Sequence, residues 1–137
     1  MSREVVSTPN APAAIGPYSQ AIKANGFVFV SGCIGLHPET KQLAGSIEDQ
    51  TRQVLENLKS IVEASGSSLE KVCKTTILLS SMSDFATVNS IYSEYFPTNP
   101  PARATFAVAG LPLGAAIEIE CNALAWYNIK IYLRLLC

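Results

Sequence analysis

The dipeptide Asn25-Gly26, set between two apolar runs, constrains the fold of this chain more than any other feature. Both central residues of a tight type I′ turn need positive φ, which Asn-Gly tolerates well. Residues 18–24 and 27–33 are therefore predicted to form a β-hairpin. The second run begins Phe-Val-Phe-Val and is apolar on both faces of a strand. Helices can cover one face, but the other needs cover too, so the pattern predicts a homo-oligomer.

Two segments show the spacing of apolar residues that is typical of helices. The first follows Ser46, which with Asp49 resembles a capping box, and it ends at Gly66, which can adopt a left-handed conformation. The second is predicted to begin at Ser83 or Asp84 and to stop before the prolines that start at position 97. Its predicted buried stripe consists of Phe85, Val88, Tyr92, Tyr95 and Phe96.

Further strands are expected at Val5-Val6, 72–79, 103–109 and 116–125, where β-branched and apolar residues dominate. Together with the hairpin and the two helices, they predict an α+β fold. We expect a sandwich with a mixed sheet of about six strands and both helices on one face, in a single domain of residues 1–125.

Composition excludes several classes of function. Of the 137 residues, 48% are hydrophobic and 15% charged, with a net charge of -1, which argues against a disordered chain and against a nucleic-acid-binding surface. Four cysteines without a CxxC pair and the single His37 offer no metal site. The residues after Met1 resemble neither a signal nor a transit peptide and no apolar run could span a bilayer, so we expect a cytoplasmic protein, or an organellar one after processing.

Four stretches resemble the Rid (reactive intermediate deaminase, YjgF-like) family, of the RidA type. They match in order and interval, and the resemblance covers roughly residues 5 to 124. The stretches are Ile15–Ala21, Val30–Gly32, Asp84–Asn89, and a last one that runs from Pro101-Ala102-Arg103 to Ile117–Glu120.

The resemblance implies a chorismate-mutase-like fold and a homotrimer with clefts between subunits. It also implies a 2-iminobutanoate/2-iminopropanoate deaminase. Such an enzyme hydrolyses reactive enamines and imines, such as 2-aminoacrylate, that escape from pyridoxal-phosphate enzymes, giving 2-keto acids and ammonia without metal or cofactor. Two alternatives remain: an endoribonuclease or translation inhibitor, and a metabolite-binding regulator without turnover. A single histidine and a pI near 5.8 disfavour the RNA hypothesis.

Three residues are the predicted catalytic group. The guanidinium of Arg103 can bind the substrate carboxylate through two parallel hydrogen bonds. Glu118 matches the family's functional glutamate and could activate water and protonate nitrogen, whereas Glu120 on the same strand face is expected to be solvent-facing. Tyr18, after Gly16-Pro17, matches a tyrosine that lines the family's pocket.

Four further residues are predicted to bind substrate. Gly32 lets the backbone approach a ligand, and Ser31 adds a hydroxyl. Asn89 matches a family asparagine near the cleft, and Thr105, on the strand face of Arg103, stands where many relatives carry cysteine.

Three features depart from the family pattern. Cys33 and Gly110 replace other residue types and could alter the pocket. Residues 126–137 form an atypical tail that fits either a strand or a helix.

Overall fold

The structure is a computed structural model that describes residues 2–125. The predicted tail, including Cys137, lies outside these described residues. The strands are β1 (Glu4–Val6), β2 (Ala21–Ala24), β3 (Phe27–Ile34), β4 (Val72–Leu79), β5 (Ala102–Ala107) and β6 (Ile117–Leu124). The helices are α1 (Ile47–Ala64) and α2 (Phe85–Tyr95), and short 3₁₀ turns occupy Leu69–Lys71, Met82–Asp84 and Pro112–Gly114.

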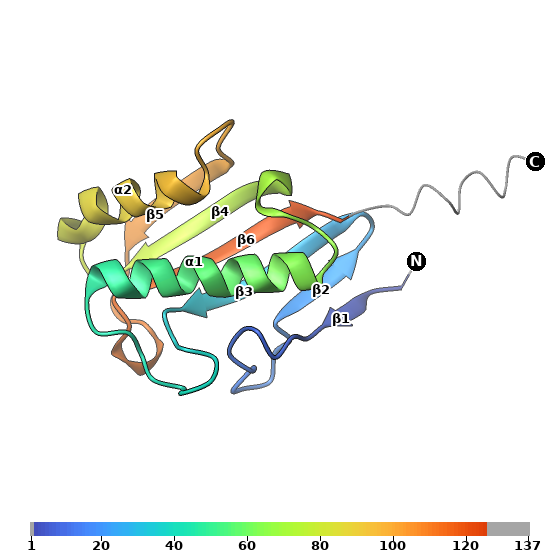
Figure 1. The fold of residues 1–137 in the computed structure, drawn as a ribbon, viewed down its shortest axis with the longest axis horizontal. Helices are drawn as coiled ribbons and strands as arrows, with labels where there is room; N and C mark the ends of the chain where they lie inside the picture. Colours follow the sequence, from blue (N-terminus) through green and yellow to red (C-terminus); the bar gives the residue numbers. More distant parts are fainter. Residues whose placement is uncertain (1, 126–137) are drawn as a thin grey trace, which may run out of the picture.

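The six strands form one sheet in the order β1-β2-β3-β6-β4-β5. All neighbours are antiparallel except β4 and β5, which run parallel because α2 connects them. Both helices lie on the same face of the sheet (Figure 1). The predicted α+β architecture, with a six-stranded mixed sheet and two helices on one face, is confirmed.

The hairpin at Asn25-Gly26 forms as predicted. Asn25 has φ 48° and Gly26 has φ 81°, as a type I′ turn requires. The register of β3 against β6 then shifts between Val30 and Cys33, which marks a β-bulge at Ser31 and Gly32. The bulge turns these two residues away from regular pairing at the end of the strand.

The first helix begins and ends as its sequence predicts. The Ser46 hydroxyl accepts the Asp49 N–H at 3.1 Å, and Gly66 follows the helix with φ 79°. The strands at 103–109 and 116–125 are also present, with ends that differ by one or two residues.

The second helix begins at the predicted position, but without a side-chain cap. Asp84 occupies the cap position and its side chain makes no capping hydrogen bond. A 3₁₀ turn precedes the helix, and there the Ser81 hydroxyl accepts the N–H of Ser83 instead. In the predicted stripe, Val88, Tyr92 and Phe96 are buried, whereas Phe85 and Tyr95 are only half-buried and Ile91 is buried in addition.

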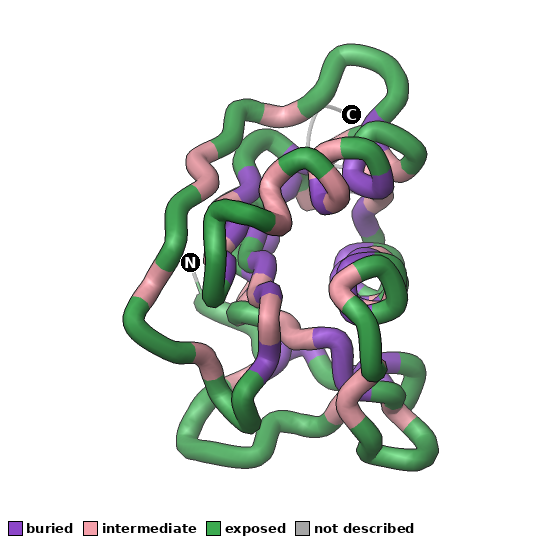
Figure 2. Tube along the Cα trace, turned by 90° about the vertical axis from the view of Figure 1, so that its left-hand side faces the viewer, coloured by how far each residue is buried: buried purple, intermediate pink, exposed green. Residues whose placement is uncertain are grey.

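The apolar core lies where the helices face the sheet (Figure 2). Leu55 and Leu58 of α1 meet Ile77 of β4 and Ile117 and Ile119 of β6, and all five are fully buried.

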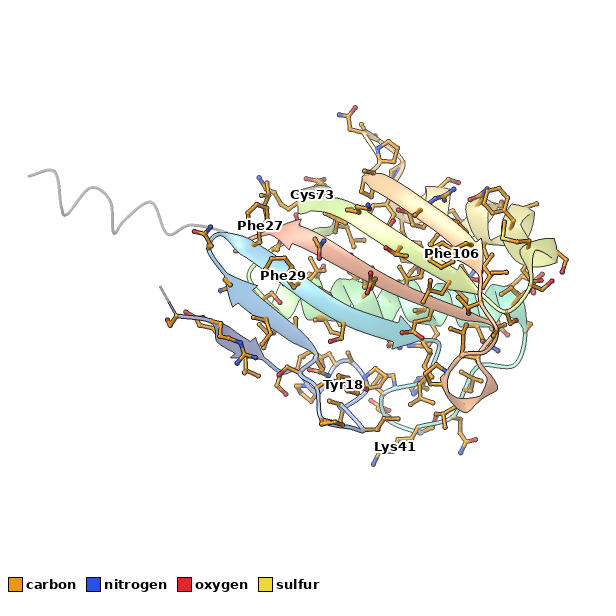
Figure 3. The ribbon with its side chains drawn as sticks, turned by 180° about the vertical axis from the view of Figure 1, so that it is seen from behind. Tyr18, Phe27, Phe29, Lys41, Cys73 and Phe106 are labelled. Carbon is orange, nitrogen blue, oxygen red and sulfur yellow. The ribbon has the colours of Figure 1, made fainter. Side chains whose placement is uncertain are left out.

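No helix of the described residues covers the other face of the sheet, which we call the open face (Figure 3). Four large apolar side chains there, Phe27, Phe29, Phe106 and Leu124, are 40–48% exposed. The rings of Phe27 and Phe29 lie 6.2 Å apart. These side chains leave the open face partly apolar in the described residues.

Candidate active site

A cavity of about 80 Å³ lies beside the bulge of β3, and four predicted site residues line it. They are Tyr18, Ser31, Gly32 and Glu118. The cavity also has apolar walls, among them Pro12 and Ile34. A small apolar hollow with one carboxyl group is suited to a small polar substrate with a short side chain.

Gly32 is required by the position of Glu118. A β-carbon at residue 32 would collide with the carboxylate of Glu118. The missing side chain of Gly32 therefore makes the space that the Glu118 carboxylate occupies across the bulge.

The pKa of Glu118 is raised, first by burial and then by the charge of Glu120. Glu120 lies two residues along the same strand, on the same face, and is exposed as predicted. A half-buried carboxyl group with a raised pKa can take up and release a proton nearer to neutral pH than an ordinary glutamate.

Gln20 holds the loop that forms one wall of the cavity. Its buried amide accepts the N–H of Thr8 at 2.7 Å and donates to the carbonyls of Thr8 at 3.1 Å and Pro12 at 2.8 Å. Sequence reasoning did not assign Gln20 a role, although the residue lies in the Ile15–Ala21 stretch. The only feature of the sequence that could have pointed to this role is a glutamine placed directly before a strand.

The cavity-lining hydroxyls have local partners. Ser31 donates its hydroxyl to the carbonyl of Ser19 at 2.6 Å, which joins the loop to β3 and leaves the oxygen's lone pairs for other donors. The Tyr18 hydroxyl accepts a long bond of 3.4 Å from the Ile15 N–H, and Tyr18 itself is half exposed.

Cys33 also lines the cavity. Burial, and after it the charge of Glu118, raise the pKa of the thiol to about 12. Cys33 is therefore a neutral thiol at physiological pH and contributes a soft apolar wall. Gly110, the other departure, is exposed with open space around it, and His37 accepts backbone N–H groups within its own loop.

Two of the remaining predicted residues, Arg103 and Asn89, line a hollow of about 340 Å³ between α2 and the start of β5. Thr105 follows on the same strand but does not line this hollow. Within residues 2–125, Arg103 forms no ion pair. The side-chain oxygens of Asn89 and Thr105 are buried without a hydrogen-bond partner in the described part of the chain. Arg103 is exposed beside the hollow, whereas these two oxygens are buried.

Arg103 and Glu118 do not meet within one chain. Arg103 pairs in register with the buried Thr75 and lies against α2, on the helix-covered face. Glu118 alternates with the buried Ile117 and Ile119, so it points to the open face. The predicted residues therefore form two half-sites, one around Glu118 and one around Arg103.

Neither a metal-binding cluster nor a membrane-spanning helix is present in residues 2–125. There, no three His, Cys, Asp or Glu side chains come together in a way that could hold a metal ion. Neither described helix combines the length and apolar character needed to cross a membrane.

Comparison with known proteins places the chain among close relatives. Residues 8–125 match the family model described as Endoribonuclease L-PSP. Reactive Intermediate Deaminase A, chloroplastic, from Arabidopsis thaliana is 60% identical over 90% of this chain, which spans 66% of that relative's length. The 2-iminobutanoate/2-iminopropanoate deaminase of Mus musculus is 48% identical, over 93% of this chain and 96% of that relative. A crystal structure of E. coli TdcF with bound serine has a TM-score of 0.87 at 37% identity, covering 90% of this chain and 99% of that chain.

Proposed function

Because this chain belongs to the Rid family, we propose that it is a deaminase that hydrolyses small 2-imino acids and their enamine tautomers to 2-keto acids and ammonia. Relatives named for this activity support the proposal. The structural observation that carries it is the Glu118 carboxylate, which lies over Gly32 in a small cavity with its pKa raised.

Arg103 supplies the recognition of substrate. A 2-imino acid carries a carboxylate next to the reacting carbon, and a guanidinium binds a carboxylate with two parallel hydrogen bonds. Arg103 has no competing anionic partner within residues 2–125. Asn89 borders the same hollow, and Thr105 lies two residues along β5 on the face of Arg103.

Glu118 supplies the proton transfers. As a carboxylate it takes a proton from water while the water oxygen adds to the imine carbon, and it passes that proton to the imine nitrogen, which turns C=NH into the carbinolamine C(OH)–NH₂. It then takes the hydroxyl proton and delivers it to nitrogen, so that the C–N bond breaks, the carbonyl forms and ammonia leaves. The balance needs only water, because neither carbon nor nitrogen changes oxidation state overall. Tyr18 and the backbone at Ser31-Gly32 line the space in which the water and the imine would lie.

The two half-sites require more than one copy of the chain. We infer a homotrimer in which the Glu118 half-site of one subunit faces the Arg103 half-site of the next. Two observations support this: the open face exposes Phe27, Phe29 and Leu124, and Arg103 and Glu118 point to opposite sides of the sheet. The trimer and the assignment of residues to subunits are part of the proposal.

The test couples a pyridoxal-phosphate dehydratase acting on serine or threonine to this protein. The rate at which the imine becomes keto acid is measured. We expect wild type to accelerate this step and Arg103→Ala to lower kcat/KM on the order of 10- to 100-fold, as expected for lost bonds to a charged group. Arg52→Ala, which removes an exposed arginine of α1, is the matched control and should act like wild type.

Gly32→Ala probes the other half-site. The added methyl group would displace the flexible carboxylate of Glu118, so kcat should fall on the order of 10-fold or more while the fold persists. Gly110→Ala is the control, because open space surrounds residue 110. No acceleration by wild type would refute the deaminase proposal. Cleavage of RNA by the same preparation would then support the ribonuclease function in the name of the family model, and imine binding without turnover would support a regulator.

For the cellular compartment we infer the cytoplasm or an organelle. The Arabidopsis relative is described as chloroplastic, which supports an organellar form among close relatives. Fractionation of cells that express the tagged full chain would test this assignment, and recovery of the protein with membranes would contradict it.

A further inference from the structure

The guanidinium of Arg103 lies against two aromatic rings of α2. Its central carbon is 5.0 Å from the ring centre of Tyr92 and 5.8 Å from that of Phe85. Both distances are within the range of cation–π attraction. Asn89, which lies one turn from each aromatic residue on the same helix, borders the same hollow.

Tyr92 is itself held in place. Its hydroxyl is 2.6 Å from the hydroxyl of Thr75 on β4, and the two residues are 5% and 0% exposed. The ring of Phe96 packs against Tyr92 with 4.7 Å between centres. Burial raises the pKa of Tyr92, so the phenol keeps its proton and its bond to Thr75 at neutral pH.

Thr75 and Arg103 are direct partners in the parallel β4–β5 ladder. The contacts therefore close a ring: the Arg103 backbone lies next to that of Thr75, Thr75 fixes the Tyr92 hydroxyl, and the Tyr92 ring supports the Arg103 guanidinium. Core burial explains an apolar side chain at position 92. It does not explain a hydroxyl bonded across to the strand that neighbours the arginine.

We propose that Tyr92, oriented by Thr75, is a positioning residue that holds the plane of the Arg103 guanidinium in the orientation needed to bind a substrate carboxylate. The proposal rests on the proposed deaminase function. Arginine has high rotamer freedom on an edge strand, and a stacked ring reduces the entropy lost when both hydrogen bonds form. Tyr92 touches neither water nor the imine in this scheme, so its effect is on substrate affinity and is transmitted through Arg103.

The test compares Tyr92→Leu, Tyr92→Phe and Thr75→Val with wild type. KM and kcat are measured for imine hydrolysis, and the Kd for pyruvate, a 2-keto acid with the same carboxylate, is measured by calorimetry. We expect Tyr92→Leu to raise KM and the pyruvate Kd about threefold to thirtyfold and to change kcat less than threefold. Tyr92→Phe keeps the ring but loses the bond to Thr75, so it should raise the pyruvate Kd measurably, though less than Tyr92→Leu does. Thr75→Val removes the same hydrogen bond from the other side and should match Tyr92→Phe.

A second arm separates positioning from loss of structure. In an Arg103→Lys background the planar group is absent, so Tyr92→Leu should there change the pyruvate Kd less than twofold. Gel filtration and thermal unfolding identify any variant that does not fold. If Tyr92→Leu is such a variant, the pair Tyr92→Phe and Thr75→Val decides, with equal and measurable losses of affinity expected.

Three outcomes would overturn the proposal: wild-type pyruvate affinity in folded Tyr92→Leu, wild-type affinity in both conservative variants, or the same fold-change in the Arg103 and Lys backgrounds. Failure of the deaminase function is seen separately, as wild type that binds pyruvate in the Tyr92-dependent manner but does not accelerate imine hydrolysis.

Discussion

At the scale of single residues, two carboxyl groups on one strand have different surroundings. Glu118 lies half-buried beside the cavity, and Glu120 is exposed two residues further along β6. Burial is the larger cause of the raised pKa of Glu118, and the charge of Glu120 is the smaller one. A substitution of Glu120 would remove the smaller contribution without changing a residue that lines the cavity.

We expect Glu120→Gln to move the acid limb of the kcat/KM profile to lower pH. Removing the neighbouring negative charge lowers the pKa of Glu118, so the carboxylate that activates water forms at lower pH. The control is Glu63→Gln, which removes an exposed charge from α1. An acid limb that stays in place in Glu120→Gln would show that another group limits activity at low pH.

The same pKa shift predicts the sign of the pH dependence of stability. The folded chain holds a proton on Glu118 up to a higher pH than the unfolded chain, whose glutamates titrate near roughly 4.3. The contribution of Glu118 to stability is therefore fully present below that value and is lost as pH rises through the raised pKa of the folded state.

The sequence suggested some residues of the candidate site and not others. Arg103, Glu118 and Gly32 were predicted by resemblance to a family, together with the chemistry of their side chains. Tyr92 was predicted only as part of an apolar stripe, because helical spacing indicates burial but not the bond to Thr75, seventeen positions earlier. Gln20 was missed for the same reason: its partners Thr8 and Pro12 come close only when the loop folds back.

At the scale of secondary-structure elements, one buried amide joins α1 to the wall of the cavity. Asn57 is 1% exposed and donates to the carbonyls of Ile34 at 3.0 Å and Leu36 at 2.8 Å. Ile34 and Leu36 both line the cavity. Asn57 satisfies two backbone carbonyls at and after the end of β3. The helix therefore fixes the segment that forms this wall of the cavity.

Replacing Asn57 by leucine should therefore destabilise the fold by roughly 1–3 kcal/mol, because buried carbonyls lose their donor. Urea unfolding at a fixed protein concentration measures the change. Arg52→Ala, on the exposed side of the same helix, should shift the midpoint far less. A wild-type midpoint in Asn57→Leu would mean that water replaces the amide.

Elements with a strong local signal were predicted well. Asn25-Gly26 sets a turn by its own backbone preferences, and Ser46 and Gly66 bound α1 through local bonds and conformation. The start of α2 at Asp84 was predicted, but the missing side-chain cap was not, because it depends on the 3₁₀ turn at Met82–Asp84. The bulge at Ser31-Gly32 had no signal beyond a glycine, since it depends on the register with β6.

At the scale of the whole molecule, the open face is the main unpartnered surface of the described residues. A charge placed in its centre should prevent assembly while leaving the core intact. We expect Phe29→Asp to change the mass in light scattering from three times 14.7 kDa to that of one chain, with helical circular dichroism retained. Imine hydrolysis should be lost with the trimer.

The control for Phe29→Asp is Glu63→Lys, which changes charge on the opposite, helix-covered side of the molecule. A trimer that survives Phe29→Asp would contradict the proposed use of the open face. The exposed apolar side chains of this face were predictable in part from the Phe-Val-Phe-Val run. The division of the site residues between the two faces was not, because it depends on which face of β5 meets α2.

Arg103 and Glu118 lie on opposite sides of one sheet, which has a consequence for inheritance. In the proposed ring of three, a chain that lacks Arg103 disables the Glu118 of its neighbour, although that neighbour is normal. The damage from one altered gene copy would then spread to the product of the intact copy. Conversely, two different defective alleles, one altered in each half-site, would restore activity in mixed trimers. They would do so only at the sites that combine the two intact half-sites.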